Sequence, residues 1–159
     1  LYMTPKPTGM FTLDMVDETK NVILVATGTG VAPYMSMLRS NALKRKANLM
    51  VIHGASNSWD LGYSSELQLL ETMFDNFVYY PTITEPEKEP AGWAGDTRWI
   101  EEIWEDDIVE KKFGFKPTPE NTHLFLCGNP HMIKSMEEIL NKEGFKKHKT
   151  IGCNNLNFF

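Results

Sequence analysis

The stretch Asn21-Val-Ile-Leu-Val-Ala-Thr-Gly-Thr-Gly-Val-Ala-Pro33 indicates the fold of this chain. An apolar run typical of a buried strand ends at Thr27, two glycines follow, and Pro33 opens a segment with helical spacing. A strand that turns through glycine into a helix directs backbone N–H groups at one point, and the helix N-terminus adds a partial positive charge. The stretch therefore predicts a site for a phosphate or diphosphate, and nucleotide binding is the first hypothesis.

Composition and charge are those of one globular domain. The 159 residues are 42% hydrophobic and 11% aromatic, which excludes a disordered chain. The net charge of −5 indicates no nucleic-acid partner, and no apolar stretch is long enough to span a membrane. Leu1 opens no secretory signal, and Cys127 and Cys153 form no disulfide framework. We expect a piece of a longer protein in a cytoplasmic, reducing setting.

Apolar runs alternate with helical segments along the chain. The expected strands are 11–16, 22–26, 49–53, 77–84 and 123–127, and the expected helices follow Pro33 and cover 67–74, 97–104, 107–113 and 130–142. This alternation is typical of a doubly wound, Rossmann-like α/β fold, so we predict a mainly parallel five-stranded sheet with helices on both faces. Ligands of such sheets bind beyond the carboxyl ends of the strands. The residues expected to line one crevice there are Thr27, His53, Thr84 and Cys127.

The pattern Gly28-x-Gly30-x-x-Pro33 lacks the third glycine of the general dinucleotide fingerprint. The acidic residue that often ends the second strand and holds a ribose is also absent, because His53-Gly-Ala-Ser56 stands there. From spacing alone, two interpretations stay open. One is nucleotide binding, and the other is a tight turn that needs glycine only for its backbone angles.

A second glycine turn, Cys127-Gly-Asn-Pro130, repeats this arrangement late in the chain. We expect the Cys127 thiol to face the ligand and Gly128 to let that ligand come close; the alternative is a small buried apolar residue. No base stands beside the thiol, because the helix start at Pro130 is expected to turn His131 away. A contact role is therefore favoured over nucleophilic chemistry.

Other residues that often bind metals or bases form no site. No metal site is expected, since ligand-like spacing is missing among His53, His123, His131 and His148. We interpret three tryptophans as packing residues rather than as a stacking platform, namely Trp93, Trp99 and Trp104.

Five motifs occur in order along the chain, at Thr27–Leu38, Ile52–Gly54, Asp60–Leu67, Tyr79–Thr84 and Cys127–Met132. Together they resemble the NAD(P)-binding domain of the ferredoxin–NADP reductase superfamily, especially its bacterial members, over about residues 6–142. Lys6–Gly9, followed by Phe11–Leu13, resembles the last strand of the flavin-binding barrel that precedes this domain. The resemblance implies that residues 1–16 end such a barrel and that residues 17–159 form the NAD(P)-binding domain.

This resemblance implies hydride transfer between a nicotinamide and FAD, and then single electrons passed to ferredoxin or flavodoxin. By the same resemblance, Thr27 to Val31 hold the diphosphate, and Cys127 to Pro130 lie against the nicotinamide. Cys127 is the expected contact at the reacting ring. The cofactor-binding residues implied in full are Thr27, Gly28, Thr29, Gly30, Val31, Pro33, Gly54, Ser56, Tyr63, Thr84, Glu85, Arg98, Gly128, Asn129, Pro130 and Met132.

Departures from the superfamily pattern bear on the cofactors. Relatives that use NADP usually carry arginines where this chain has Ser56 and Glu85, while Arg98 still supplies one cation. A carboxylate repels a 2′-phosphate but accepts a hydrogen bond from a ribose hydroxyl, so NADH is favoured. FAD is expected to be bound mainly by a barrel that these residues do not contain. The tail that ends at Phe159 is a poor strand, which weakens its match to the family's aromatic residue near the flavin.

Two rival functions stay open. The first is the reductase component of an oxygenase system, which would use the same cofactors and a different electron acceptor. The second is a non-catalytic nucleotide-sensing module that kept the fold without flavin. The expected partners are the FAD-binding barrel and a ferredoxin, flavodoxin or oxygenase, with no nucleic acid and no membrane span.

Overall fold

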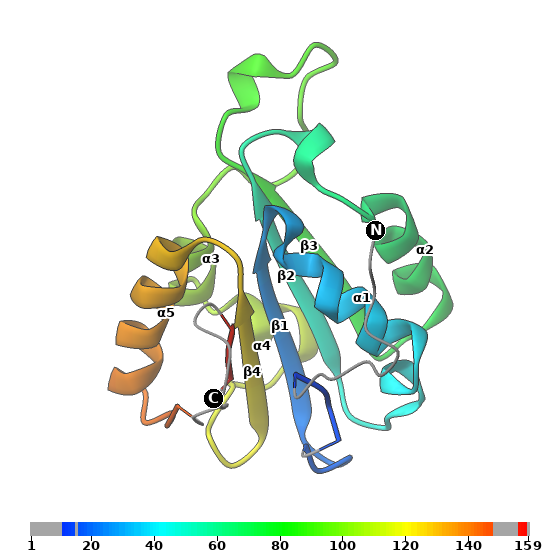
Figure 1. Cartoon of the computed structure of the whole chain (residues 1–159), viewed down its shortest axis with the longest axis vertical. Coiled ribbons are helices and arrows are strands. Elements are labelled where there is room, and N and C mark those ends of the chain that lie inside the picture. Colours follow the sequence, from blue (N-terminus) through cyan, green and yellow to red (C-terminus); the bar gives the residue numbers. More distant parts are fainter. Residues whose placement is uncertain (1–10, 15, 148–155, 159) are drawn as a thin grey trace, which may run out of the picture.

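A computed structural model describes residues 11–14, 16–147 and 156–158 of the chain. At its centre lies a five-stranded sheet in the order β3-β2-β1-β4-β5 (Figure 1). The strands are β1 Asn21–Thr27, β2 Leu49–Ala55, β3 Phe77–Ile83, β4 Thr122–Cys127 and β5 Leu156–Phe158. The predicted Rossmann-like α/β class is confirmed. The parallel part has four strands rather than five, because β5 pairs antiparallel with the end of β4.

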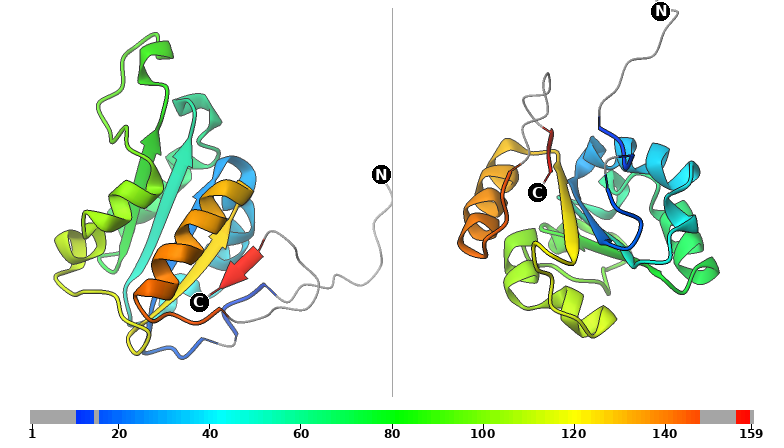
Figure 2. Two further views of the ribbon diagram at one scale, coloured as in Figure 1. Left: turned by 90° about the vertical axis from the view of Figure 1, so that its left-hand side faces the viewer. Right: turned by 90° about the horizontal axis from the view of Figure 1, so that it is seen from below.

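Helices cover both faces of the sheet. They are α1 Ala32–Arg39, α2 Ser64–Met73, α3 Ile100–Glu105, α4 Ile108–Phe113 and α5 Pro130–Lys142. The first two lie on one face, and α3, α4 and α5 lie on the other (Figure 2). The sheet is thus buried on both sides between two hydrophobic clusters, as a parallel sheet requires.

The continuous apolar run of β1 contributes side chains to both hydrophobic clusters. Val22, Leu24 and Ala26 pack into the cluster under α1 and α2. Ile23 and Val25 pack into the cluster under α3, α4 and α5. Because side chains alternate between the faces of a strand, a strand covered on both sides needs apolar residues at every position.

The segment before β1 differs from the prediction. A strand over residues 11–16 is wrong for the described positions, which form bends and a turn closed by the Val16 N–H and the Leu13 carbonyl (3.0 Å). Phe11 still reaches the core, with its ring centroid 5.9 Å from that of Tyr34 and 5.2 Å from that of Phe125. The predictions that concern Lys6–Gly9, Cys153 and Phe159 fall outside the described residues.

The sheet order positions the site. β1 lies between β2 and β4 and runs parallel to both, so the chain moves outward from β1 in two directions. The loops after β1 and β4 diverge at this point, which leaves a crevice at the carboxyl ends of the strands. Within the described part of the chain, no helix is both long and apolar enough for a membrane crossing.

Candidate functional site

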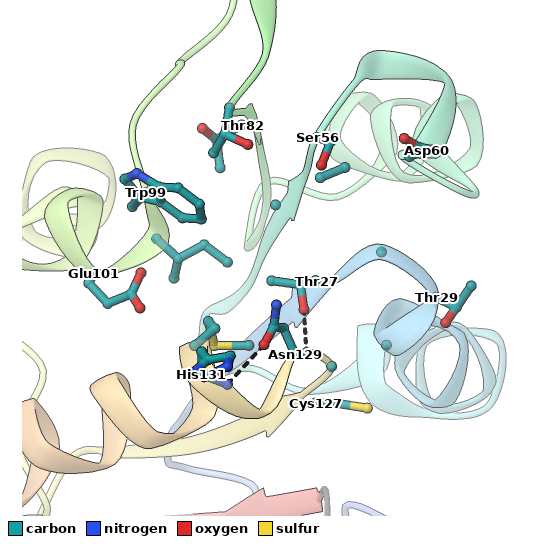
Figure 3. A pocket seen from close by; sticks show the side chains of 18 of the residues that line it. Thr27, Thr29, Ser56, Asp60, Thr82, Trp99, Glu101, Cys127, Asn129 and His131 are labelled. Atoms are coloured by element: carbon teal, nitrogen blue, oxygen red, sulfur yellow. Dashed lines mark hydrogen bonds between the residues drawn. The ribbon is translucent and has the colours of Figure 1, made fainter.

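A cleft of about 1070 Å³ opens at the carboxyl ends of the parallel strands (Figure 3). It collects residues from both halves of the sequence, because β1 and β4 are neighbours in the sheet. The residues expected as ligand contacts that line it are Thr27, Gly28, Thr29, Gly30, Pro33, Gly54, Ser56, Thr84, Arg98, Cys127, Gly128, Asn129, Pro130 and Met132.

The chain leaves β1 through one 3-10 turn, Gly28–Val31, before α1 begins. Gly28 has a φ of +51°, in the left-handed region that favours glycine. Gly30 is required for a different reason, since a Cβ there would overlap the backbone carbonyl of Cys127. Pro33 lies in the first turn of α1, where its missing N–H is not needed. The turn therefore offers main chain rather than bulky side chains to the cleft.

The turn after β4 is joined to this first turn. Gly128 has a φ of +132°, and a Cβ there would overlap the Thr27 hydroxyl. The Asn129 N–H donates to Thr27 Oγ1 at 2.6 Å. The Asn129 side chain caps α5 by accepting from the His131 N–H at 2.8 Å. Close glycine packing and this hydrogen bond hold the ends of β1 and β4 together.

His53 supports the site from beneath, so the prediction that it lines the crevice is wrong. Its side chain is fully buried, with Nε2 at 2.9 Å from the Gly28 carbonyl and Nδ1 at 3.3 Å from the Tyr79 hydroxyl. Burial lowers the pKa of His53, and the bond to Gly28 offsets only part of this effect. A neutral imidazole that donates to Gly28 and accepts from Tyr79 satisfies both contacts and ties β2 and β3 to the first turn.

Where the cleft meets β3 and α3, it is lined mainly by side chains, and some of these are charged. Arg98 lines the cleft, but its guanidinium pairs with Asp96 at 2.5 Å and Asp106 at 2.9 Å. Its hydrogen bonds lower the pKa of Asp96 well below the ordinary value, and the two carboxylates raise the pKa of Arg98. The Thr82 hydroxyl donates to the Arg98 carbonyl at 2.7 Å, which fixes this segment to β3. The cation at this side is therefore already neutralised by its neighbours.

Three predicted contacts are not among the lining residues. Val31 is buried in the core under α1. The ring of Tyr63 lies at the surface, with the Arg39 guanidinium 5.3 Å from its centroid. Glu85 forms an ion pair with a lysine of its own loop, yet its N–H donates to the Ser56 carbonyl at 2.9 Å. Glu85 thus stays beside the rim of the cleft.

The cleft also contains residues that the sequence analysis missed, namely Ala55, Asp60, Thr82, Trp99, Ile100, Glu101 and His131. His131 lines the cleft because the start of α5 forms part of its wall (Figure 3). Trp99 is not a packing residue, since it is 63% exposed, whereas Trp104 is 6% exposed in the core. The sequence offered one clue that Trp99 and Glu101 line the cleft, since both lie close to Arg98, which was a predicted contact.

The groups that line the cleft suit a phosphate and a sugar. Among the described residues, no group of three or more His, Cys, Asp or Glu side chains has the geometry to hold a metal ion. The lining instead combines glycine main chain, hydroxyl groups and a helix start, which bind phosphate and sugar oxygens. The lining residues come from the ends of β1, β2, β3 and β4, so the cleft crosses the ends of all four parallel strands.

Fold and cleft together define an α/β domain with a nucleotide site at its switch point. Residues 24–138 match the family model of the oxidoreductase NAD-binding domain, and the chain belongs to this family. The resemblance to the ferredoxin–NADP reductase superfamily is thereby confirmed.

Named relatives agree with this assignment. The flavodoxin/ferredoxin–NADP reductase of Buchnera aphidicola subsp. Schizaphis graminum is 32% identical over 144 residues, which cover 90% of this chain and 55% of the relative. The Escherichia coli K12 enzyme of the same name is 31% identical over 130 residues, or 81% of this chain and 51% of the relative. A ferredoxin NADP+ reductase from Neisseria gonorrhoeae, solved with bound FAD and NADP, superposes with a TM-score of 0.75 at 27% identity, over 91% of this chain and 57% of that one. The chain thus spans about half the length of these relatives.

Proposed function

We propose that this chain is the pyridine-nucleotide-binding domain of an FAD-dependent oxidoreductase of the ferredoxin/flavodoxin–NAD(P) reductase type. The observation that carries the proposal is the junction of the two glycine turns, where the Asn129 N–H bonds to Thr27 Oγ1 inside the cleft. When bound, the nicotinamide and FAD supply the hydride chemistry. The part of this chain is to hold and orient the nicotinamide nucleotide.

The two glycine turns bind different parts of the nucleotide. The main chain of Gly28–Val31 receives the diphosphate, because glycine permits close approach and the following helix start favours negative charge. Cys127 and Gly128 contact the nicotinamide at the end of β4, and Met132 lines the same cleft. Cys127 acts there by contact and not as a nucleophile. The remaining predicted residues in the cleft complete the set of cofactor contacts.

NADH is the proposed nucleotide. Asp60 and Glu101 bring carboxylates to the cleft, and Arg98 is already paired with acidic neighbours. Ser56 and Glu85, joined by a backbone hydrogen bond at the rim, bring no cation. A 2′-phosphate therefore meets repulsion, whereas a ribose hydroxyl meets acceptors. Calorimetric titration with NADH and NADPH is expected to show tighter NADH binding; equal or tighter NADPH binding would refute the preference, and binding of neither would refute the site.

FAD is proposed to be held mainly by a flavin-binding barrel, of which residues 1–16 form the end, while residues 17–159 are the NAD(P)-binding domain. The setting proposed for the whole protein is the cytoplasm. Its proposed electron acceptor is ferredoxin or flavodoxin, with an oxygenase as the second candidate. A cytochrome P450 reductase from Amycolatopsis shares this fold, with a TM-score of 0.66 at 22% identity. Membership of an oxidoreductase family gives no support to a non-catalytic sensor.

The acceptor is tested with the full-length protein loaded with FAD. We expect NADH oxidation to reduce a ferredoxin or flavodoxin in a coupled assay. Reduction of an oxygenase component alone would assign the oxygenase role instead. Binding of NADH without any flavin-dependent turnover would contradict the proposed enzyme class while leaving the nucleotide site intact.

A further inference from the structure

We propose that Phe11 and Arg45 are positioning residues for hydride transfer, because they fix the segment before β1 and so set how a preceding flavin-binding domain lies against the cleft. This inference rests on the proposed function, in which FAD is held mainly by that domain. Neither residue is among those that line the cleft, so both act on the reaction through orientation and not through contact with the nucleotide.

Phe11 packs against the two elements that carry the glycine turns. Its ring centroid is 5.9 Å from that of Tyr34 on α1 and 5.2 Å from that of Phe125 on β4. Phe125 lies two residues before Cys127, and both side chains belong to the cluster under α1 and α2, because alternate residues of a strand share a face. α1 begins directly after the turn Gly28–Val31. Through Phe11, the chain before β1 is therefore tied to the elements behind both glycine turns.

The two aromatic partners of Phe11 are themselves fixed. Tyr34 is fully buried, and its hydroxyl donates to the Val25 carbonyl at 3.0 Å. Phe125 is buried in the middle of β4, which pairs with β1 along its length. Closely packed rings of this kind leave little room for displacement. The contact at Phe11 therefore sets the direction from which the chain approaches the sheet.

Arg45 fastens the turn that leads into β1. Its Nη1 donates to the Val16 carbonyl at 3.3 Å, and its Nη2 donates to the carbonyls of Asp17 and, at 3.4 Å, Lys20. The tip of this turn is exposed, so packing contributes little to holding it. A guanidinium suits this arrangement, because its donors form a rigid planar fork that reaches several carbonyls at once.

Arg45 is also fixed from its own side, at some energetic cost. The Asn76 side chain donates to the carbonyls of Arg45 at 2.8 Å and Ala47 at 3.2 Å. In the described structure, the Nε atom of Arg45 is buried without a hydrogen-bond partner, and burial lowers the pKa of this guanidinium. The hydrogen bonds to the turn offset that cost. Arg45 is thus a fixed post to which the turn before β1 is attached.

Fixing the segment at two points bears directly on hydride transfer. The reacting atoms of donor and acceptor must lie about 3–3.5 Å apart, and a displacement of about 1 Å can cost about 100-fold in rate. Phe11 and Arg45 hold the chain on either side of Leu13, which itself packs against the same cluster. A domain that precedes this segment is thereby held in one orientation relative to the cleft.

The test uses the full-length protein loaded with FAD. Anaerobic stopped-flow measurement of flavin reduction by NADH separates the limiting rate of reduction from the dissociation constant of NADH. Phe11→Ala and Arg45→Gln are each expected to lower the limiting rate by about tenfold. The dissociation constant is expected to stay within about twofold of the wild type, because neither residue lines the cleft. Phe11→Leu, which keeps an apolar side chain without the ring, is expected to give an intermediate rate.

Two matched variants control for a general loss of stability. Phe74 is also a partly buried phenylalanine packed against the same cluster, but it lies at the end of α2, so Phe74→Ala is the control for Phe11→Ala. Lys44→Gln removes an exposed charge beside Arg45. Both controls are expected to keep the limiting rate within about twofold of the wild type. Urea denaturation identifies the conditions under which every variant is folded.

Limiting rates of Phe11→Ala and Arg45→Gln equal to that of the wild type would overturn this inference, and so would an equal loss in the controls. An effect on the dissociation constant alone would also overturn it, because the two residues would then act on the cleft. Failure of NADH to reduce the flavin of the wild-type protein would instead overturn the proposed function.

Discussion

The two sides of the cleft differ in composition, because one is formed mainly by main chain and the other by side chains. The backbone side consists of Thr27–Gly30 and Cys127–Pro130, where glycines allow main chain to pack on main chain. The side-chain side consists of Ser56, Thr82 and Arg98–Glu101, where a guanidinium paired with carboxylates and an exposed indole line the cleft. In the proposed function, the first arrangement receives a diphosphate, which every dinucleotide shares. The second is proposed to distinguish one nucleotide from another.

This division has a physical consequence. Substitutions on the backbone side push one turn against the other, so they act on folding and binding together. Substitutions of the partly exposed residues of the side-chain side, such as Ser56 and Arg98, change charge at the surface of the cleft with little effect on the core, so we expect them to change which nucleotide binds. Four substitutions should separate these two behaviours.

Gly30→Ala is expected to lower the free energy of unfolding by about 3 kcal/mol and to abolish nucleotide binding, because its Cβ overlaps the Cys127 carbonyl. Urea denaturation followed by circular dichroism measures the stability change. The matched control is Gly62→Ala, whose Cβ would meet no atom within 4 Å. Its effect is expected to stay within about 0.5 kcal/mol. Equal stabilities of the two variants would contradict the close packing of the two turns.

The double variant Ser56→Arg/Glu85→Arg is expected to raise the affinity for NADPH relative to NADH by about 100-fold, through two charge-assisted hydrogen bonds to the 2′-phosphate. The two side chains start from neighbouring loops, which a backbone hydrogen bond of 2.9 Å joins. Calorimetry with both nucleotides measures the ratio. Glu87→Arg changes charge at an exposed position of the same loop and is expected to leave the ratio nearly unchanged. A similar shift in that control would mean that net charge, and not the rim, sets the preference.

His53 makes the stability of the backbone side depend on pH. Burial lowers its folded-state pKa below the ordinary value of 6.5, so the unfolded chain binds the proton more tightly. The contribution of His53 to the free energy of unfolding is therefore complete above about pH 6.5. It is lost as the pH falls below that value, by at most about 1.4 kcal/mol per pH unit. Denaturation of wild type and His53→Gln between about pH 7.5 and 5.5 tests this. The free energy of unfolding of His53→Gln should fall less steeply with decreasing pH than that of the wild type. Identical slopes for the two proteins would contradict a buried neutral imidazole.

Asp96→Asn is expected to produce the smallest change. It removes one of the carboxylates that neutralise Arg98, so NADPH should gain about threefold in affinity while Asp106 still pairs with the guanidinium. NADH should be nearly unaffected. Fluorescence titration of both nucleotides measures the difference. An unchanged NADPH affinity would show that the Arg98 head group does not reach the 2′ position.

The backbone side could be predicted from the sequence, and the side-chain side only in part. A strand followed by Gly28 and Gly30, repeated by Gly128, is a local pattern, because glycine is required wherever φ is positive or backbones touch. The parallel strands follow from apolar runs that must be buried on both faces. The antiparallel β5 does not follow from such a run, because its asparagine-rich surroundings carry no strand signal.

The positions of several residues could not be predicted from the sequence, because they depend on how elements far apart in the chain pack together. Trp99 and Glu101 reach the cleft because the end of the loop after β3 returns to that strand, where Asp96 pairs with Thr82 and Ile83, and no local pattern encodes that return. His53 ends in the interior because β2 continues past it to Ala55, whose N-terminal neighbours remain fully buried. Tyr63 faces solvent because its backbone has a positive φ of 62° just before α2. Each depends on how elements pack rather than on residue type.

The central claim is that both glycine turns bind one nucleotide. An NADH titration of the isotope-labelled chain, followed by amide NMR resonances, tests it most directly. We expect the amides of Gly28–Val31 and of Gly128 and Asn129 to shift together with a single dissociation constant, while those of the exposed residues Leu69 and Met73 on α2 do not move. Shifts at only one turn, or shifts centred on α2, would contradict it.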